Sequence, residues 1–202
     1  PGLMAWLDEN QDLLDQYDST AYDPRKAKEV FESKGYTMGS SGYYEKGGER
    51  LTVDILVKSA ATVLPPLLVQ MLNAVGIDAA PKALASAQYY DNRNRGDFEI
   101  ETTHVACGSV AEPFGELDNL HSRWIKPEGE IRSDNPWGWS NPEYDEIVDQ
   151  IGNLPPNDPQ EHELFRQALE IRLKELPILS LSQQKRIVPY TTKYWTNWPT
   201  ED

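Results

Sequence analysis

The chain has 202 residues, with 33 acidic against 19 basic side chains and a formal net charge of −14. Its 39% hydrophobic and 26% charged residues are typical of a soluble globular protein that can bury a substantial core. The acidity argues against nucleic acid and anionic membranes as partners, because both attract positive patches, and its simplest role is solubility.

Cysteine and targeting signals leave the compartment open. Cys107 is the only cysteine, so an internal disulfide is impossible. That fits the cytoplasm and equally a secreted or lipid-anchored bacterial protein without disulfides. No apolar run approaches the ~18 residues that span a bilayer, and residues 1–4 lack the pattern of a signal peptide. We interpret the abrupt ends of the chain as those of a piece of a longer protein.

The first half of the chain predicts alternating helices and strands. Asp23-Pro24 caps and starts a helix that ends near Lys34-Gly35. Residues 39–48 are rich in glycine, serine and tyrosine and predict a turn region. Residues 50–57 first alternate between apolar and polar side chains and then become continuously apolar, which indicates a largely buried strand.

The pattern continues to residue 106. Leucines at helical spacing predict a helix over 64–75, ended by Gly76, and residues 77–80 predict a short strand. Residues 84–93 are compatible with another helix, and residues 97–106 alternate as a strand does. This order indicates an α/β fold, with crossover helices between the strands of a sheet.

The second half begins with a long irregular segment. Residues 107–138 predict a loop, and loops of this length are usually functional or disordered. Asn141-Pro142 and Asp158-Pro159 then each predict the start of a helix with an apolar face. Residues 177–182 predict a buried strand.

Several short elements, taken in order, resemble one family. They are Tyr22-Asp-Pro-Arg-Lys-Ala-Lys28 with Gly35-Tyr36, the strand at 50–56, Val75-Gly-Ile77, Gly96-Asp-Phe-Glu99, Asn141-Pro-Glu-Tyr-Asp145 and Glu175-Leu-Pro-Ile178. Over residues 20–190 the chain resembles the C-terminal lobe of solute-binding protein family 5. These are the extracytoplasmic oligopeptide, dipeptide and oligosaccharide binders of ABC importers. Ala79 departs from the family pattern, which favours valine there.

The resemblance implies a fold and a role. It implies a periplasmic-binding-protein type II-like lobe, with a mixed sheet flanked by helices. Residues 1–202 would form a single lobe, the C-terminal one of two, and 190–202 would cross toward the missing lobe. The expected protein is an extracytoplasmic monomer without cofactor. It would bind an oligosaccharide or peptide in a hinged interlobe cleft and deliver it to the membrane permease subunits.

The segment after the 97–106 strand is expected to face that cleft, because ligands bind beyond the carboxyl ends of strands in open α/β sheets. In peptide-binding members this segment carries an aspartate that pairs with the peptide amino terminus, and Ser109 stands there in this chain. The loop offers aromatic rings instead, and sugars stack on such rings. The candidate ligand-binding residues are Cys107, Gly108, Ser109, Glu112, Phe114, Trp124, Trp137 and Trp139.

The sequence leaves alternatives open. Each loop tryptophan can equally belong to the core, and Trp195 and Trp198 favour packing or interlobe contacts. Glu112 with Asp118 or Glu116 would suit a carbohydrate-active hydrolase, which needs two carboxylates facing across a cleft. A pure protein-interaction domain is the third possibility, and it would lack a cleft-sized apolar pocket.

The sequence contains no motif that supports catalysis, metal binding or nucleotide binding. The acids of the first helical turns after Pro142 (Glu143, Asp145, Glu146 and Asp149) are interpreted as a solvated face near the positive end of the helix dipole. The calcium-loop pattern is absent. His104, His121 and His162 lack metal-ligand spacing, and no phosphate-binding glycine motif occurs. The sequence therefore predicts a binding module with no catalytic residue, no metal and no cofactor.

Overall fold

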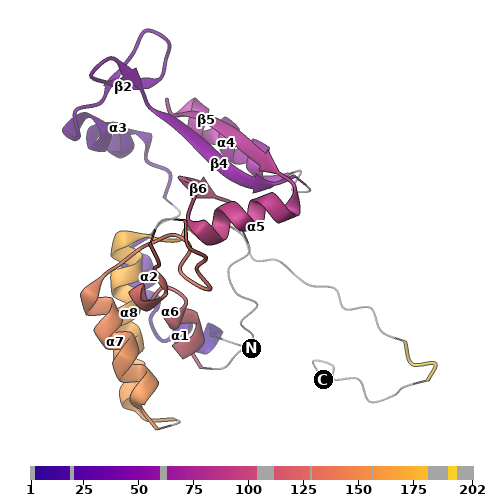
Figure 1. Ribbon diagram of the computed structural model, residues 1–202. Coiled ribbons are helices and arrows are strands. Elements are labelled where there is room, and N and C mark those ends of the chain that lie inside the picture. Colours follow the sequence, from indigo (N-terminus) through magenta and orange to yellow (C-terminus); the bar gives the residue numbers. More distant parts are fainter. Residues whose placement is uncertain are drawn as a thin grey trace.

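The computed structural model describes residues 3–18, 21–59, 63–103, 112–127, 129–155, 157–181 and 191–194. Figure 1 shows an α/β part, built by the segment from α3 to β6, beside a helical part to which both halves of the chain contribute. The helices are α1 (Met4–Asp8), α2 (Gln11–Gln16), α3 (Pro24–Ser33), α4 (Leu64–Ala74), α5 (Ser86–Arg95), α6 (Phe114–Asp118), η1 (Ser122–Trp124), α7 (Pro142–Asn153) and α8 (Gln160–Glu175).

The α/β part contains a parallel sheet with the strand order β5-β4-β6. Its strands are β4 (Thr52–Lys58), β5 (Asp78–Leu84) and β6 (Ile100–Glu101). The chain leaves β4 through α4 to β5 on one side, then crosses through α5 to β6 on the other side. The carboxyl ends of β4 and β6 therefore flank the topological switch point, which is where ligands bind in open α/β sheets.

Burial on this sheet explains the apolar run in the sequence. Ile55 and Val57 point to the face covered by α4 and form a cluster with Ala79 and side chains of α4. Leu56 lies on the opposite face and is also fully buried. The strand predicted at 50–57 and the helix predicted at 64–75 are thus confirmed, and the predicted strand at 77–80 extends to Leu84.

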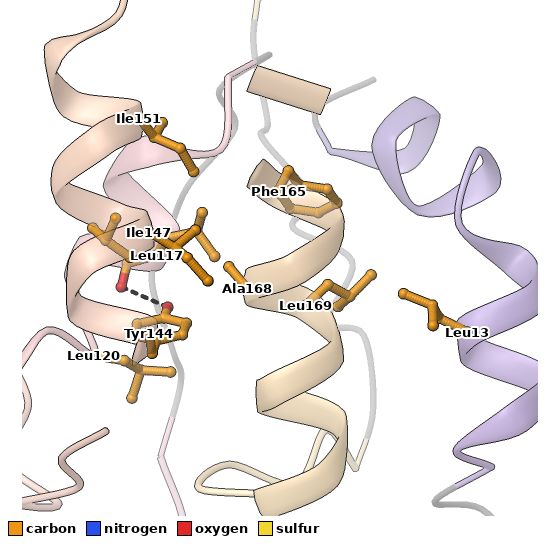
Figure 2. Packing of buried hydrophobic residues seen from close by; sticks show 10 residues of the cluster. Leu13, Leu117, Leu120, Tyr144, Ile147, Ile151, Phe165, Ala168 and Leu169 are labelled. Atoms are coloured by element: carbon orange, nitrogen blue, oxygen red, sulfur yellow. Dashed lines mark hydrogen bonds between the residues drawn. The ribbon is translucent and has the colours of Figure 1, made fainter. Parts of the chain in front are cut away.

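The helical part has its own core (Figure 2). Its buried residues are Leu13, Leu117, Leu120, Tyr144, Ile147, Val148, Ile151, Phe165, Ala168 and Leu169. The Tyr144 hydroxyl donates a hydrogen bond of 2.8 Å to the carbonyl of Leu117, so the buried phenol keeps a partner. Arg166 of α8 pairs with Asp12 of α2, which ties the start of the chain to this core.

The helices predicted from their caps are confirmed. The Asp23 carboxylate accepts hydrogen bonds from two backbone N–H groups at the start of α3. The Asn141 side chain likewise accepts the N–H of Tyr144 at the start of α7. These bonds satisfy backbone N–H groups in the first turn, which have no hydrogen-bond partner within the helix. A local sequence motif is therefore enough to predict where such a helix starts.

Two predictions for the α/β part need correction. The turn region at 39–48 contains strand β2 (Tyr44–Lys46), which pairs with β1 (Thr37–Met38) and β3 (Glu49–Arg50), because Tyr44 is buried and stacks on Phe31. Within the described residues, the strand predicted at 97–106 is reduced to Ile100 and Glu101. The Glu99 carboxylate accepts a hydrogen bond from the backbone N–H of Asp54 in β4. A side chain thus occupies the position where a backbone carbonyl of a longer β6 would accept this bond.

Two predictions for the second half also need correction. The segment predicted as a loop from 107 to 138 contains the short helices α6 and η1. Residues 177–181 form no strand, and Leu179 and Leu181 are 57% and 54% exposed. Pro177 lacks a backbone donor, and this apolar run pairs with no strand in the described part of the chain. No helix in the described ranges is long and apolar enough to cross a membrane.

The contact between α6 and α7 gives a matched pair of glycine variants. A Cβ at Gly152 would lie 2.7 Å from the Phe114 ring, whereas a Cβ at Gly115 meets nothing within 4 Å. We expect Gly152→Ala to lower the free energy of unfolding by about 1–3 kcal/mol through overpacking. Gly115→Ala should leave it unchanged or raise it by up to about 1 kcal/mol, because alanine favours helix. Urea unfolding of both variants measures the difference, and equal effects would refute the contact.

Candidate ligand-binding site

The carboxyl end of β4 carries a lysine held by a tyrosine of α5. Lys58 Nζ lies 3.4 Å from the Tyr90 hydroxyl and 4.9 Å from the centre of its ring. Tyr90 is 48% exposed, so part of this aromatic side chain faces solvent. No ion pair to Lys58 occurs among the residues that the structure describes. The end of the central strand thus presents a cation and a phenol together.

The carboxyl end of β6 carries a buried carboxylate. The Glu101 side chain is 1% exposed, and its Oε2 accepts a 3.0 Å hydrogen bond from Tyr89 and lies 3.3 Å from Arg93 Nε. Burial raises the pKa of Glu101 above its usual value, while Arg93 opposes the shift. Burial also raises the pKa of Tyr89 to about 12, so this phenol remains a hydrogen-bond donor at neutral pH.

Trp137 links this network to the helical core. The guanidinium of Arg93 lies 5.6 Å from the centre of the Trp137 ring. The indole N–H is close enough to the Glu101 carboxylate to lower its pKa, although Oε1 has no hydrogen-bond partner of good geometry among the described residues. Trp137 also packs against the core of the helical part. Among the predicted site residues that the structure describes, Trp137 lies beside the end of β6.

The other predicted aromatic residues lie within the helical part. Trp139 donates a 2.7 Å hydrogen bond to Glu175 and meets the edge of Tyr144, with ring centres 4.9 Å apart. Phe114 packs against the core. The Trp124 indole donates to the carbonyl of Asp118 at 2.9 Å. These three rings are partly buried.

The remaining predicted residues fall on the segment before α6. Glu112 is exposed, and its carboxylate accepts the backbone N–H of Phe114 at the first turn of α6. Cys107, Gly108 and Ser109 lie outside the described residues. The structure therefore brings Trp137 to the strand ends and places the other described candidates along α6 and η1 and against α7.

The acids of α7 require a correction. Glu143 and Glu146 are solvated as predicted, but Asp145 accepts the backbone N–H of Ser122 at 3.0 Å and its side chain is only 15% exposed. Asp149 pairs with Arg123. The two aspartates are one helical turn apart and both face η1, so they hold that turn against α7.

Two other hollows lie on the surface of the described residues. A hollow of about 620 Å³ runs along α7 and α8, and another of about 670 Å³ lies at the amino ends of β4 and β6. Neither is lined by any of the predicted ligand-binding residues. Within the described ranges, no three histidine, cysteine, aspartate or glutamate side chains could hold a metal ion.

Lys58, Tyr89, Tyr90 and Glu101 are not among the site residues predicted from the sequence. Two signals were present: adjacent tyrosines in a polar helical segment, and a lysine directly after the apolar run of a buried strand. Only the register of β4 and β6 and the packing of α5 show that these residues meet at the switch point.

Comparison with known proteins agrees with this fold. The model of bacterial extracellular solute-binding proteins, family 5 Middle, matches residues 4–122. No curated protein sequence matches significantly.

Solved structures resemble most of the chain. A Thermotoga maritima periplasmic oligopeptide-binding protein with bound mannohexaose has a TM-score of 0.74 and 24% identity, over 88% of this chain and 33% of that one. Oligopeptide-binding AppA from Bacillus subtilis, with a nonapeptide, has a TM-score of 0.64 and 17% identity, over 77% and 30%. MelB from Agrobacterium fabrum, with stachyose, has a TM-score of 0.60 and 18% identity, over 77% and 25%. The predicted type II lobe fold is confirmed, and the chain spans a third or less of these structures.

Proposed function

The chain belongs to the family 5 bacterial extracellular solute-binding proteins, and from this premise we propose that it is one lobe of an oligosaccharide receptor of an ABC importer. It binds its ligand outside the cytoplasm, without cofactor or catalysis, and the complex is recognised by the membrane permease. Hinge closure of two lobes around the ligand is the proposed mechanism.

The proposed domain arrangement follows the lengths of the similar proteins. The chain covers 33% of the Thermotoga protein while 88% of its own residues match. We therefore assign residues 1–202 to one lobe of a monomeric receptor and residues 190–202 to the crossing toward the other lobe. The ligand would lie between the lobes, at the carboxyl ends of β4 and β6.

The proposal of a sugar ligand rests on the aromatic side chains that lie near these strand ends. Trp137 and Tyr90 flank the ends of β6 and β4, where rings favour the apolar faces of sugars. Ser109 in place of the peptide-anchoring aspartate supports the same choice. The proposed ligand-contacting set consists of Cys107, Gly108, Ser109, Glu112, Phe114, Trp124, Trp137 and Trp139. A peptide is the second candidate, because a similar structure holds a nonapeptide.

A hydrolase is less well supported. The Glu112 carboxylate caps the first turn of α6. Asp118 lies 3.2 Å from Arg123 and accepts the Trp124 indole N–H. Both carboxylates therefore have structural partners, whereas a glycosidase needs them free to face the scissile bond.

Titration of the 202-residue chain with mannohexaose, stachyose and a nonapeptide tests the proposal. We expect the sugars to bind with Kd on the order of millimolar, because one lobe supplies half of the cleft walls. Amide and indole NMR signals of Trp137 and of residues 102–109 should shift on sugar binding. Tighter binding of the peptide would contradict the sugar assignment, and the appearance of shortened sugars would show a hydrolase.

A further inference from the structure

Two cations approach the strand ends at the switch point, but only one of them is neutralised. Arg93 lies against the buried Glu101 carboxylate at 3.3 Å. Lys58 has only the neutral Tyr90 hydroxyl as a hydrogen-bond partner and no ion pair within the described part of the chain. In a chain of net charge −14, the described residues at this end of the sheet thus keep an unbalanced positive charge. Such a charge attracts an anionic group of a ligand.

The side chains around Lys58 are held in place by a series of contacts. The Tyr89 hydroxyl is fixed by Glu101 Oε2 and by the carbonyl of Thr102. Tyr90 meets the edge of Tyr89 with ring centres 5.2 Å apart, and Lys58 lies over the Tyr90 ring. The buried carboxylate therefore orders the exposed ring and the lysine, so little side-chain entropy remains to be lost on binding.

We propose that Lys58 and Tyr90 form a ligand subsite that takes a sugar ring carrying a carboxylate. The exposed part of Tyr90 contacts the apolar face of the ring, and the Lys58 ammonium binds the carboxylate. The subsite rests on the proposed function and adds to it that the ligand is an acidic oligosaccharide. Glu101 acts through Tyr89 and is a positioning residue.

The test compares two sugars that differ only in the carboxylates. Mannohexaose and a hexamer of mannuronic acid are titrated into the 202-residue chain, followed by NMR shifts at low salt. We expect the acidic sugar to bind about tenfold more tightly, as one charge-assisted contact allows. Added salt should reduce this preference, because the contact is partly exposed.

Three variants test whether the preference for the acidic sugar arises at this subsite. Lys58→Gln should abolish it, so that the two sugars bind with equal affinity, since only the acidic sugar makes an ionic contact with Lys58. Lys58→Arg keeps the charge and should retain the preference, which separates charge from any loss of stability. Lys46→Gln is the matched control, because it removes the same charge from another lysine that lies over a tyrosine ring, in the separate sheet that contains β2.

The outcomes distinguish the two proposals. Equal binding of both sugars, unchanged by Lys58→Gln, would overturn the subsite and leave the oligosaccharide receptor in place. A preference that survives in Lys58→Gln, or one that disappears equally in Lys46→Gln, would place the anion elsewhere and also overturn it. Binding of neither sugar would overturn the receptor proposal and the subsite together.

Discussion

Replacement of Asn135 by alanine is expected to lower the free energy of unfolding by about 3–5 kcal/mol. The Asn135 side chain is fully buried, and its amide N–H₂ donates to the carbonyls of Leu120 at 3.0 Å and Trp139 at 2.7 Å. A third acceptor, the carbonyl of His121, lies at 3.3 Å. Alanine would leave the carbonyls of Leu120 and Trp139 without this donor, whereas the His121 carbonyl keeps the backbone N–H of Trp124. Alanine would also occupy a backbone conformation of φ +42° that asparagine tolerates better.

Two further variants separate these contributions. Asn135→Gly removes the side chain but relieves the backbone, so it should be less destabilising than Asn135→Ala if the positive φ matters. Asn153→Ala removes an exposed amide that, within the described residues, bonds only to the carbonyl of Asp149, and it should change stability by less than about 0.5 kcal/mol. Urea unfolding followed by tryptophan fluorescence measures all three. A loss below 1 kcal/mol for Asn135→Ala would refute the bridging role.

Asn135 also shows which features a single sequence can predict. The caps of α3 and α7 join residues two or three positions apart, so the motifs Asp23-Pro24 and Asn141-Pro142 are sufficient to predict them. The Asn135 bonds to the 120–121 segment span 14 or 15 residues of irregular chain. No periodicity marks such contacts, so the sequence predicts this segment only as a long irregular loop.

The same limit applies to the site. The proposed position of the cleft, at the carboxyl ends of the strands, follows from the predicted order of strands and helices. The tryptophans of the loop could be identified by type, but Trp139 hydrogen-bonds Glu175 whereas Trp137 reaches Arg93 of α5. These partners lie far away in the chain, so composition alone cannot separate a ring of the helical core from one at the strand ends.

Replacement of Arg93 by methionine is expected to lower the free energy of unfolding by about 3–5 kcal/mol at neutral pH, because it leaves the buried Glu101 carboxylate without its cation. The loss should depend on pH. Burial already raises the pKa of Glu101 in the folded state, and removal of Arg93 takes away the strongest opposing influence. The folded protein then binds a proton that the unfolded chain releases near pH 4.5, so stability falls as pH rises through the folded pKa. The variant should be least impaired near pH 4.5 and most impaired above neutrality.

The double variant Arg93→Met with Glu101→Gln decides between charge and packing. If the buried charge is the cause, the neutral amide should recover part of the stability lost in Arg93→Met and remove most of its pH dependence. If Arg93 acts mainly through its contact with the Trp137 ring, the loss should be the same at every pH and the second substitution should recover nothing. Lys28→Met, which breaks an exposed pair with Glu32 on α3, is the control and should produce no measurable change. Chemical unfolding between pH 4.5 and 8 distinguishes these results, and an impairment that grows toward low pH would contradict the assignment of Glu101 as the titrating group.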